Sequence, residues 1–295
     1  MEKLRTGFHG YGVAVKRLLL RGRRCFELRW PFGRPTLEYV ETHLVDHCNM
    51  NCCGCSHFSP LAEPTFADLD VFARDMASLA RLFRSIRTIR LMGGEPLLHP
   101  QVDQFLVCAR NLFPRSRIHL VTNGVLLADE PESFWAACRE NRVMLKLTVY
   151  PPMEARANTC VELCRKNGVR LVVTYTKRFC VWLNGKGDSP VNATFTLCRK
   201  TLYCPVLREG RLYACATAAY ADFYNKRFGP MLPQDGGLAL DKKDLTGREV
   251  LAWLNKPVAL CRYCAIEKGE APWRNGVAKA GDWFIATTEW PQRRG

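Results

Sequence analysis

The chain has 295 residues, of which 47% are hydrophobic, and its formal net charge is +15. A chain of this length can bury one barrel-sized core, with or without a small second unit. No apolar run reaches the roughly eighteen residues of a membrane span, and Leu18–Leu20, flanked by basic residues, is too short to predict a signal peptide.

Cysteine is unusually frequent, at fifteen residues. Disulfide-rich secreted scaffolds are usually short chains, whereas this chain is long. The sequence therefore predicts a reducing, cytoplasmic location in which thiolates bind metal. The cysteines outside the motifs below are expected to be small buried apolar residues: Cys25, Cys108, Cys138, Cys160, Cys164 and Cys180.

A basic N-terminal extension is expected over residues 1–35. Its first 34 residues hold nine Lys or Arg and two Glu, a local charge of +7. Net charge indicates partners rather than fold. An anionic substrate, a membrane surface and RNA are all compatible with it, and so is a simple solvated arm.

Residues 36–177 alternate between strand-like and helix-like segments. Such alternation predicts a parallel sheet with helices packed outside it, and parallel barrels perform their chemistry at the carboxyl ends of the strands. Strands are expected at 37–45, 85–92, 117–121, 143–149 and 169–175, and helices at 65–83, 100–113, 131–139 and 154–166.

The alternation stops after residue 177, where glycines, prolines and short apolar runs replace long helices. We expect a second, smaller unit over residues 178–270, within which a sixth barrel strand can still fall. Residues 271–295 form an aromatic-rich tail, expected to pack rather than to form a site; its aromatic residues include Trp273, Trp283, Phe284 and Trp290.

Three cysteines follow the first expected strand with the spacing C-x3-C-x2-C: Cys48, Cys52 and Cys55. Three thiolates on one short loop can hold three irons of a [4Fe–4S] cube and leave the fourth iron open to a small molecule. Structural zinc sites usually show paired C-x2-C elements and four protein ligands, which this loop lacks. Cys53 is interpreted as a bystander.

This loop resembles the signature of the radical S-adenosylmethionine (radical SAM) superfamily. The resemblance covers roughly residues 38–270 and implies an α/β fold, a partial (β/α)6 TIM-like barrel with a small C-terminal Twitch-type cluster domain. The family commonly places an aromatic residue before the third cysteine, against the adenine of SAM. Here that residue is Gly54, so Phe58 or His57 is expected to take its place.

Residues at three further strand ends match the family's SAM-binding positions. Paired glycines after the second strand allow a close backbone approach, and the resemblance makes Gly-Gly-Glu the motif that binds the SAM amino group. A Thr-Asn-Gly turn after the third strand and a threonine on the fourth complete the expected site. The implied SAM-binding residues are Gly93, Gly94, Glu95, Thr122, Asn123 and Thr148.

A second set of cysteines lies in the C-terminal part: Cys198, Cys215, Cys261 and Cys264. On spacing alone these four thiolates suit a closed [4Fe–4S] cube or a zinc ion about equally. The pattern with Gly210 resembles the shortened SPASM or Twitch domain, which implies one auxiliary [4Fe–4S] cluster. Cys204 is the rival of Cys198 for the first ligand position.

The resemblance also implies a reaction. SAM chelates the open iron, is cleaved reductively, and yields a 5′-deoxyadenosyl radical that abstracts a hydrogen atom from the substrate. An auxiliary cluster could then accept an electron and turn a carbinol into a ketone, as in Twitch enzymes that dehydrogenate an aminocyclitol. A sugar, cyclitol or nucleotide-sugar would suit the basic chain, with flavodoxin or ferredoxin as electron donor. The general base stays open among Tyr150, Tyr175 and Lys177.

Two alternatives remain open at this point. Radical modification of a peptide or protein is one, although the arm is too short for the winged-helix peptide-binding domain that such enzymes often carry. A non-catalytic iron–sulfur or zinc protein that binds RNA is the other, because the arm mixes aromatic with basic residues. The Gly-Gly-Glu motif disfavours mere binding, and formation of 5′-deoxyadenosine would distinguish the two classes.

Overall fold

The computed structural model describes residues 33–198, 204–234 and 236–285. The basic arm lies almost wholly outside these residues, as do Cys25 and Trp290. Within the described residues, no helix combines the length and the apolar character needed to cross a lipid bilayer.

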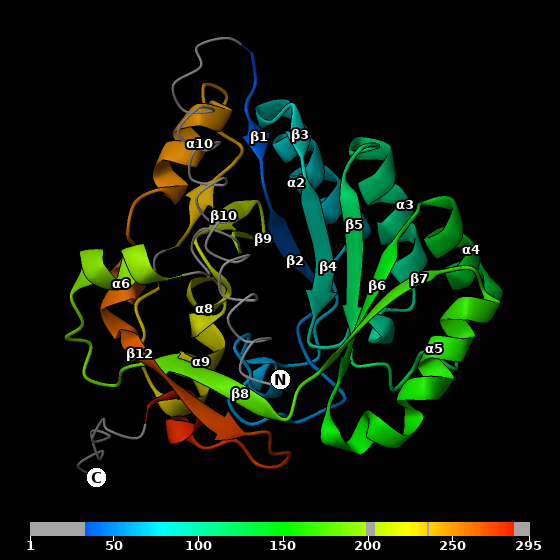
Figure 1. The fold of residues 1–295 in the computed structure, drawn as a ribbon. Helices are drawn as coiled ribbons and strands as arrows, with labels where there is room; N and C mark the ends of the chain where they lie inside the picture. Colours follow the sequence, from blue (N-terminus) through cyan, green and yellow to red (C-terminus); the bar gives the residue numbers. More distant parts are fainter. Residues whose placement is uncertain (1–32, 199–203, 235, 286–295) are drawn as a thin grey trace, which may run out of the picture.

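An eight-stranded sheet forms the centre of the molecule, in the order β11-β10-β9-β2-β4-β5-β6-β7 (Figure 1). The strands from β9 to β7 in this order pair in parallel, whereas β10 and β11 add to the β9 edge in antiparallel fashion. The sheet strands are β2 (Val40–Val45), β4 (Thr88–Gly93), β5 (Arg117–Thr122), β6 (Met144–Val149), β7 (Arg170–Tyr175), β9 (Val206–Arg208), β10 (Arg211–Tyr213) and β11 (Leu238–Ala239).

Helices α2 to α5 connect these parallel strands and cover one face of the sheet (Figure 1). They are α2 (Leu69–Leu82), α3 (Val102–Leu112), α4 (Glu132–Glu140) and α5 (Ala157–Lys166). Helix α2 starts later than the sequence pattern suggests, because the Asp68 side chain caps its first turn by accepting from the Val71 backbone N–H. The expected α/β fold with its parallel strands is confirmed.

Two smaller sheets accompany the central one. Strands β1 (Thr36–Leu37) and β3 (Ser85–Ile86) pair in parallel, and β8 (Arg178–Leu183) pairs antiparallel with β12 (Cys264–Pro272). Strand β9 is the parallel neighbour of β2, so residues 178–270 contribute to the central sheet as well as to the β8–β12 pair. The remaining helices are α6 (Val191–Leu197), α8 (Ala216–Ala219), α9 (Ala221–Phe228) and α10 (Gly247–Leu254), with short 3-10 helices η1 (Ser59–Leu61), η2 (Pro96–Leu98), η3 (Pro151–Arg156), η4 (Ala259–Tyr263) and η5 (Ala280–Trp283).

The main apolar core lies between the sheet and helices α2 to α5. Helix α2 contributes side chains at three- and four-residue steps, Phe72, Met76, Leu79 and Leu82, as an amphipathic helix does. A second apolar cluster joins Phe58 to Trp283 and Phe284 of the tail. Among the cysteines expected to be buried, Cys138, Cys160 and Cys164 are buried and Cys108 is half-buried, but the prediction is wrong for Cys180, which is exposed on β8.

Candidate active site

The cysteine loop leaves the carboxyl end of β2 and borders a cavity of about 380 Å³. Cys48, Cys52 and Cys55 all line this cavity. The ends of three neighbouring parallel strands line it too, as a barrel fold predicts. They contribute Met92, Gly93 and Gly94 from β4, Val121, Thr122 and Asn123 from β5, and Thr148 and Tyr150 from β6. The volume is in the range of small-molecule sites.

Gly93 and Gly94 bring the end of β4 into direct contact with the cysteine loop. A Cβ atom on Gly94 would lie 2.0 Å from the His47 carbonyl oxygen, and one on Gly93 would lie 2.0 Å from that of Val45. The Gly94 backbone N–H donates to the Val45 carbonyl at 2.8 Å, and the Glu95 backbone N–H donates to the His47 carbonyl at 3.1 Å. The paired glycines are therefore required by backbone packing, in addition to any approach by a ligand.

Glu95 is fully buried and organises the neighbouring turn. Its carboxylate accepts from Thr122 Oγ1 at 2.7 Å, from the Asn123 backbone N–H at 2.7 Å and from the Leu97 backbone N–H at 3.1 Å. Burial raises the pKa of Glu95 to about 7, although these hydrogen bonds oppose the rise. The side chain does not line the cavity, so a direct contact with a bound amine would require these hydrogen bonds to rearrange.

Asn123 links this turn back to the cysteine loop. Its side-chain N–H group donates to Asn49 Oδ1 at 2.7 Å and lies 3.7 Å from Cys48 Sγ. Glu95 thus acts on the cavity through Thr122 and Asn123, both of which face it.

The three thiols differ in electrostatics. Burial raises the pKa of both Cys48 and Cys52 to about 12. Burial also opposes ionisation of Cys55, but hydrogen bonds with His57 outweigh it and lower the pKa of Cys55. His57 is itself held charged: burial disfavours its charge, yet Cys55 and Glu41 raise its pKa to about 9.

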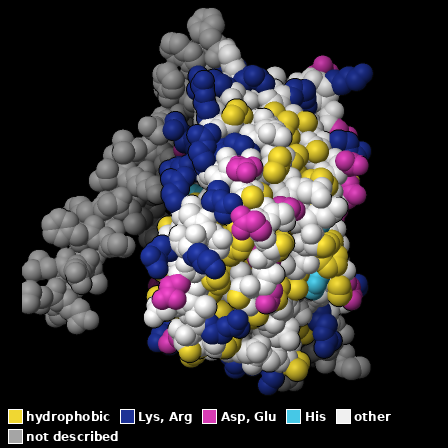
Figure 2. Space-filling view, turned by 90° about the vertical axis from the view of Figure 1, so that its right-hand side faces the viewer, with side chains coloured by type: hydrophobic (Ala, Val, Ile, Leu, Met, Phe, Trp, Pro, Cys, Tyr) yellow, Lys and Arg dark blue, Asp and Glu magenta, His cyan; other side chains and the backbone are white. Residues whose placement is uncertain are grey.

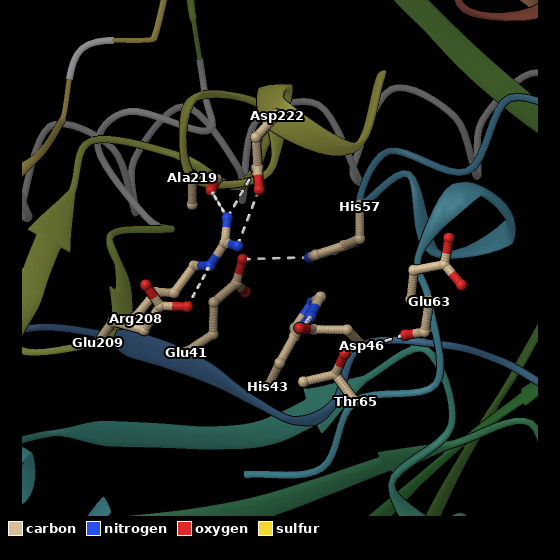
Figure 3. Close-up of polar contacts among 10 residues, drawn as sticks. All are labelled: Glu41, His43, Asp46, His57, Glu63, Thr65, Arg208, Glu209, Ala219 and Asp222. Atoms are coloured by element: carbon tan, nitrogen blue, oxygen red, sulfur yellow. Dashed lines mark hydrogen bonds and ion pairs between the residues drawn. The ribbon is translucent and has the colours of Figure 1, made fainter. Parts of the chain in front are cut away.

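A buried polar network lies behind the loop (Figure 3). His57 Nε2 points to Glu41 on β2, 3.4 Å from its Oε1, and His43 Nδ1 lies 2.8 Å from Asp46 Oδ1. The Arg208 guanidinium forms two hydrogen bonds with the Asp222 carboxylate, at 2.7 and 2.9 Å. Ion pairs to buried charges need such compensating partners. The two parts of this network meet at Tyr220, whose ring stacks on His43 and lies under the Arg208 guanidinium.

A sequence model of the radical SAM superfamily matches residues 43–176, which contain the cysteine loop and the ends of β4, β5 and β6 that line the cavity. This match places residues 43–176 in the radical SAM superfamily. Their SAM-binding and iron–sulfur character follow from that membership.

Relatives with curated names match only part of the chain. The GTP 3′,8-cyclase of Chlorobaculum tepidum is 33% identical over 96 residues, which are 32% of this chain and 28% of that protein. Molybdenum cofactor biosynthesis protein 1 of Bos taurus is 35% identical over 99 residues, 33% of this chain and 15% of that protein. The matched segments span less than a third of either relative.

Among solved structures, the chain resembles BtrN in complex with AdoMet and 2-DOIA, with a TM-score of 0.50 and 16% identity. The likeness covers 79% of this chain and 94% of BtrN. At this identity it shows a shared fold, which extends beyond the segment that the superfamily model matches.

The radical SAM loop of this chain departs from the family at Gly54, and the structure gives the reason. Gly54 has φ +77°, and a Cβ atom there would lie 2.8 Å from the Asp282 carbonyl oxygen. A larger residue is therefore excluded. Of the two expected substitutes, Phe58 is fully buried against Tyr224 and Trp283 and does not face the cavity, whereas His57 lines it, so of the two alternatives only His57 keeps that position.

Only one of the three candidate bases lines the radical SAM cavity, namely Tyr150. Tyr175 is exposed, and Lys177 forms an ion pair with Glu154 at 3.1 Å. Burial, together with the three loop cysteines, raises the pKa of Tyr150 far above its ordinary value. Tyr150 is therefore a protonated phenol at neutral pH rather than a base.

The second cysteine set is distributed over elements that contact one another. Cys198 follows α6, which packs on η4, and Thr194 Oγ1 of α6 donates to the Cys261 carbonyl at 2.9 Å. Cys215 belongs to the same apolar cluster as Leu260, the neighbour of Cys261. Gly210, with φ +71°, occupies the β9–β10 turn, where a positive φ favours glycine. Cys264 starts β12.

In the ranges that the structure describes, no three Cys, His, Asp or Glu side chains already surround the position of a single metal ion. The residues nevertheless suit a cluster at the first site, because three thiols border one cavity beside the Gly-Gly turn, and thiolate sulfur is the usual iron–sulfur ligand.

Sequence reasoning missed a further residue at this site, Trp273. Its Nε1–H donates to Cys52 Sγ at 3.1 Å, and its ring stacks on Tyr150 with centroids 5.9 Å apart. An aromatic residue more than two hundred positions from the cysteine loop gives no local signal of such a contact.

Proposed function

We propose that this chain is a radical SAM oxidoreductase that acts on a small phosphate-bearing substrate, such as a nucleotide-sugar or a phosphorylated sugar or cyclitol, and oxidises one of its carbinols. The observation that carries the radical SAM part is the convergence of Cys48, Cys52 and Cys55 with Gly93 and Gly94 on one cavity. When bound there, a [4Fe–4S] cluster and SAM supply a 5′-deoxyadenosyl radical that takes a hydrogen atom from substrate.

The substrate class rests on the sheet face that continues the cavity. Side chains alternate between the two faces of a strand. Met92, Val121 and Thr148 face the cavity, so the residues two positions earlier on β4, β5 and β6 share that face deeper in the sheet. They are Arg90, His119 and Lys146.

We call these three residues the basic floor; Arg90 and Lys146 are its cations, and their charges act on His119. Burial and the cations Lys146 and Arg90 lower the pKa of His119 to about 4, with Arg117 and Arg170 adding to the effect. Burial and Arg90 likewise lower the pKa of Lys146. Cations this close favour a bound anion, which relieves their repulsion.

Arg90 is the member of the basic floor that lines the cavity. Its buried Nε has no hydrogen-bond partner among the described residues, and its guanidinium lies 5.4 Å from the centre of the Tyr39 ring. Glu41, its neighbour in register on β2, is already bound by His57 and Tyr39. An arginine with an unused donor suits a phosphate oxygen. The space-filling view is consistent with a basic surface, with Lys and Arg gathered along its left margin (Figure 2).

The oxidation requires a second electron acceptor, and we propose that residues 178–270 provide it as a Twitch-like unit. Cys198, Cys215, Cys261 and Cys264 would hold one auxiliary [4Fe–4S] cluster. The packing of α6 on η4 supports Cys198 as the first ligand. Cys204 instead interacts with Tyr39, beside β2. A flavodoxin or ferredoxin in a reducing cytoplasm would deliver the first electron.

The test of the substrate class is formation of 5′-deoxyadenosine from SAM and dithionite by the reconstituted protein, with paired phosphorylated and unphosphorylated sugars, cyclitols and nucleosides. GTP, named for the cyclase relatives, belongs in the panel. We expect a phosphorylated member to raise 5′-deoxyadenosine formation and to be converted to a ketone. Arg90→Gln should raise KM for that member about tenfold, the effect of losing one charged contact, because Arg90 is the basic residue that lines the cavity.

Lys226→Gln is the matched control, because Lys226 is an exposed lysine on α9 whose ion pair with Glu63 is also exposed. It should leave KM unchanged. Equal stimulation by the phosphorylated and unphosphorylated members of every pair would refute the phosphate-bearing class. Stimulation by peptides alone would favour peptide modification instead.

A further inference from the structure

The C-terminal residues 273–283, which we call the strap, cover one side of the cysteine loop. The pairing is antiparallel and centred on Cys52 and Asn275. The Cys53 backbone N–H donates to the Arg274 carbonyl at 2.9 Å, and the Gly276 N–H donates to the Asn51 carbonyl at 3.1 Å. The Asn275 side chain accepts from the Asn51 N–H at 3.1 Å. The loop that holds the cysteines is thus bound like a strand to the tail of the chain.

Two indole N–H groups of the strap reach the loop itself. Trp283 is buried and donates to the Cys55 carbonyl oxygen at 2.7 Å. Trp273 donates to the Cys52 sulfur at 3.1 Å. The Trp283 contact fixes the backbone of the cysteine loop. The Trp273 contact instead reaches Cys52 Sγ, which binds iron in the proposed cluster.

Trp273 is held in place by one contact of its ring and one of its backbone. It stacks on Tyr150 at an interplanar angle of 24°, and the Trp273 backbone N–H donates to the Lys177 carbonyl at 2.9 Å. A side chain fixed in this way gives its N–H a defined direction. The hydrogen bond to Cys52 is consequently set by the fold, because these contacts select the side-chain conformation of Trp273 that makes it.

A hydrogen bond to a ligand sulfur stabilises the added negative charge of a reduced iron–sulfur cluster and so raises its reduction potential. We propose that Trp273 is a positioning residue that raises the reduction potential of the SAM-binding cluster through Nε1–H···Sγ Cys52, and that the strap holds the cysteine loop of that site in place. This inference rests on the proposed cluster at Cys48, Cys52 and Cys55. It also explains Gly54, whose lack of a side chain admits the Asp282 carbonyl of the strap.

The test is an EPR-monitored potentiometric titration of the reconstituted full chain, following the signal that changes when SAM is added. Trp273→Phe keeps a ring that can stack on Tyr150 and removes the N–H. We expect unchanged iron at this site and a midpoint potential shifted to a more negative value. Trp135→Phe is the matched control, because the Trp135 indole N–H donates to the Glu130 carbonyl and touches neither loop nor cavity. Its midpoint should equal that of the unaltered protein.

A second measurement needs no variant to fold. The unaltered protein, labelled with indole-¹⁵N tryptophan, should show one weakly coupled ¹⁵N nucleus in hyperfine spectra of the reduced, SAM-responsive cluster, as expected for an N–H group that donates to a ligand sulfur without binding iron. No coupled nitrogen, or a Trp273→Phe midpoint equal to that of the unaltered protein, would overturn the inference and leave the proposed function intact. An unaltered protein without any SAM-responsive cluster would instead refute the proposed function, and the role of Trp273 with it.

Discussion

Replacing Gly94 by alanine tests the contact between β4 and the cysteine loop. The added Cβ would lie 2.0 Å from the His47 carbonyl oxygen, 2.3 Å from its carbon and 2.8 Å from the Cys48 nitrogen. All three atoms are backbone, so no side chain can rotate away. Because Cβ contacts closer than 3.0 Å are essentially never found, the loop must move by about 1 Å.

The energetic consequence can be worked from the contacts that this movement breaks. It separates two backbone hydrogen bonds, Gly94 N–H to Val45 and Glu95 N–H to His47. Each hydrogen bond contributes about 1 kcal/mol to stability. Forcing the extra methyl group into a packed site costs a further ~1–3 kcal/mol. We expect Gly94→Ala to lower the free energy of unfolding by about 3–5 kcal/mol.

Urea unfolding of the cluster-free protein, followed by circular dichroism, measures this loss. Gly281→Ala is the control, because its Cβ would have no atom within 4 Å and its φ is not positive. It should change stability by less than about 0.5 kcal/mol. A Gly94→Ala protein that unfolds within about 1 kcal/mol of the control and binds the same amount of iron after reconstitution would refute this account of the Gly-Gly turn.

Three further predictions concern other parts of the chain. Burial raises the pKa of Glu95 from 4.5 to about 7, so the stability that protonated Glu95 contributes is complete below pH 4.5 and is lost as the pH rises through 7. Urea unfolding at pH 5 and at pH 8 should show the unaltered protein losing up to about 3 kcal/mol of stability relative to Glu95→Gln. A stability difference between the two proteins that does not change with pH would contradict this. Cys198→Ala should lower the iron content from about eight to about four per chain, whereas Cys204→Ala should leave it unchanged; the reverse result would exchange the two ligands. Asp222→Ala leaves the half-buried Arg208 guanidinium without its two hydrogen bonds to carboxylate and should lower the free energy of unfolding by about 1–3 kcal/mol, which a denaturation midpoint unchanged from the parent protein would disprove.

Much of the fold could be predicted from local pattern. Helix α2 buries Phe72, Met76, Leu79 and Leu82, the same apolar series that indicates a helix in the sequence. Strand β6 alternates buried and partly exposed residues over Met144–Val149, and the neighbouring strand β5 shows the same kind of alternation. Since the carboxyl ends of parallel strands meet at one edge, the residues at these ends were also predictable as neighbours.

The parts that could not be predicted depend on contacts between distant residues. The strap reaches the cysteine loop across more than two hundred positions, and Arg274 binds Cys53 through backbone groups that carry no side-chain signal. Phe58 packs in the second apolar cluster against Tyr224 and Trp283, both of which lie far along the chain from it. Glu95 can be recognised as part of a motif, but only the structure shows that its carboxylate supports a turn.

The most direct test of the central claim is 5′-deoxyadenosine formation by anaerobically reconstituted protein supplied with SAM and dithionite. A variant in which Cys48, Cys52 and Cys55 are all replaced by alanine provides the comparison, with iron measured in both proteins. The account predicts that the unaltered protein forms 5′-deoxyadenosine, and that the variant forms none while it keeps about half of the iron. An unaltered protein that cleaves no SAM although its clusters are loaded, or a variant that cleaves SAM equally well, would contradict it.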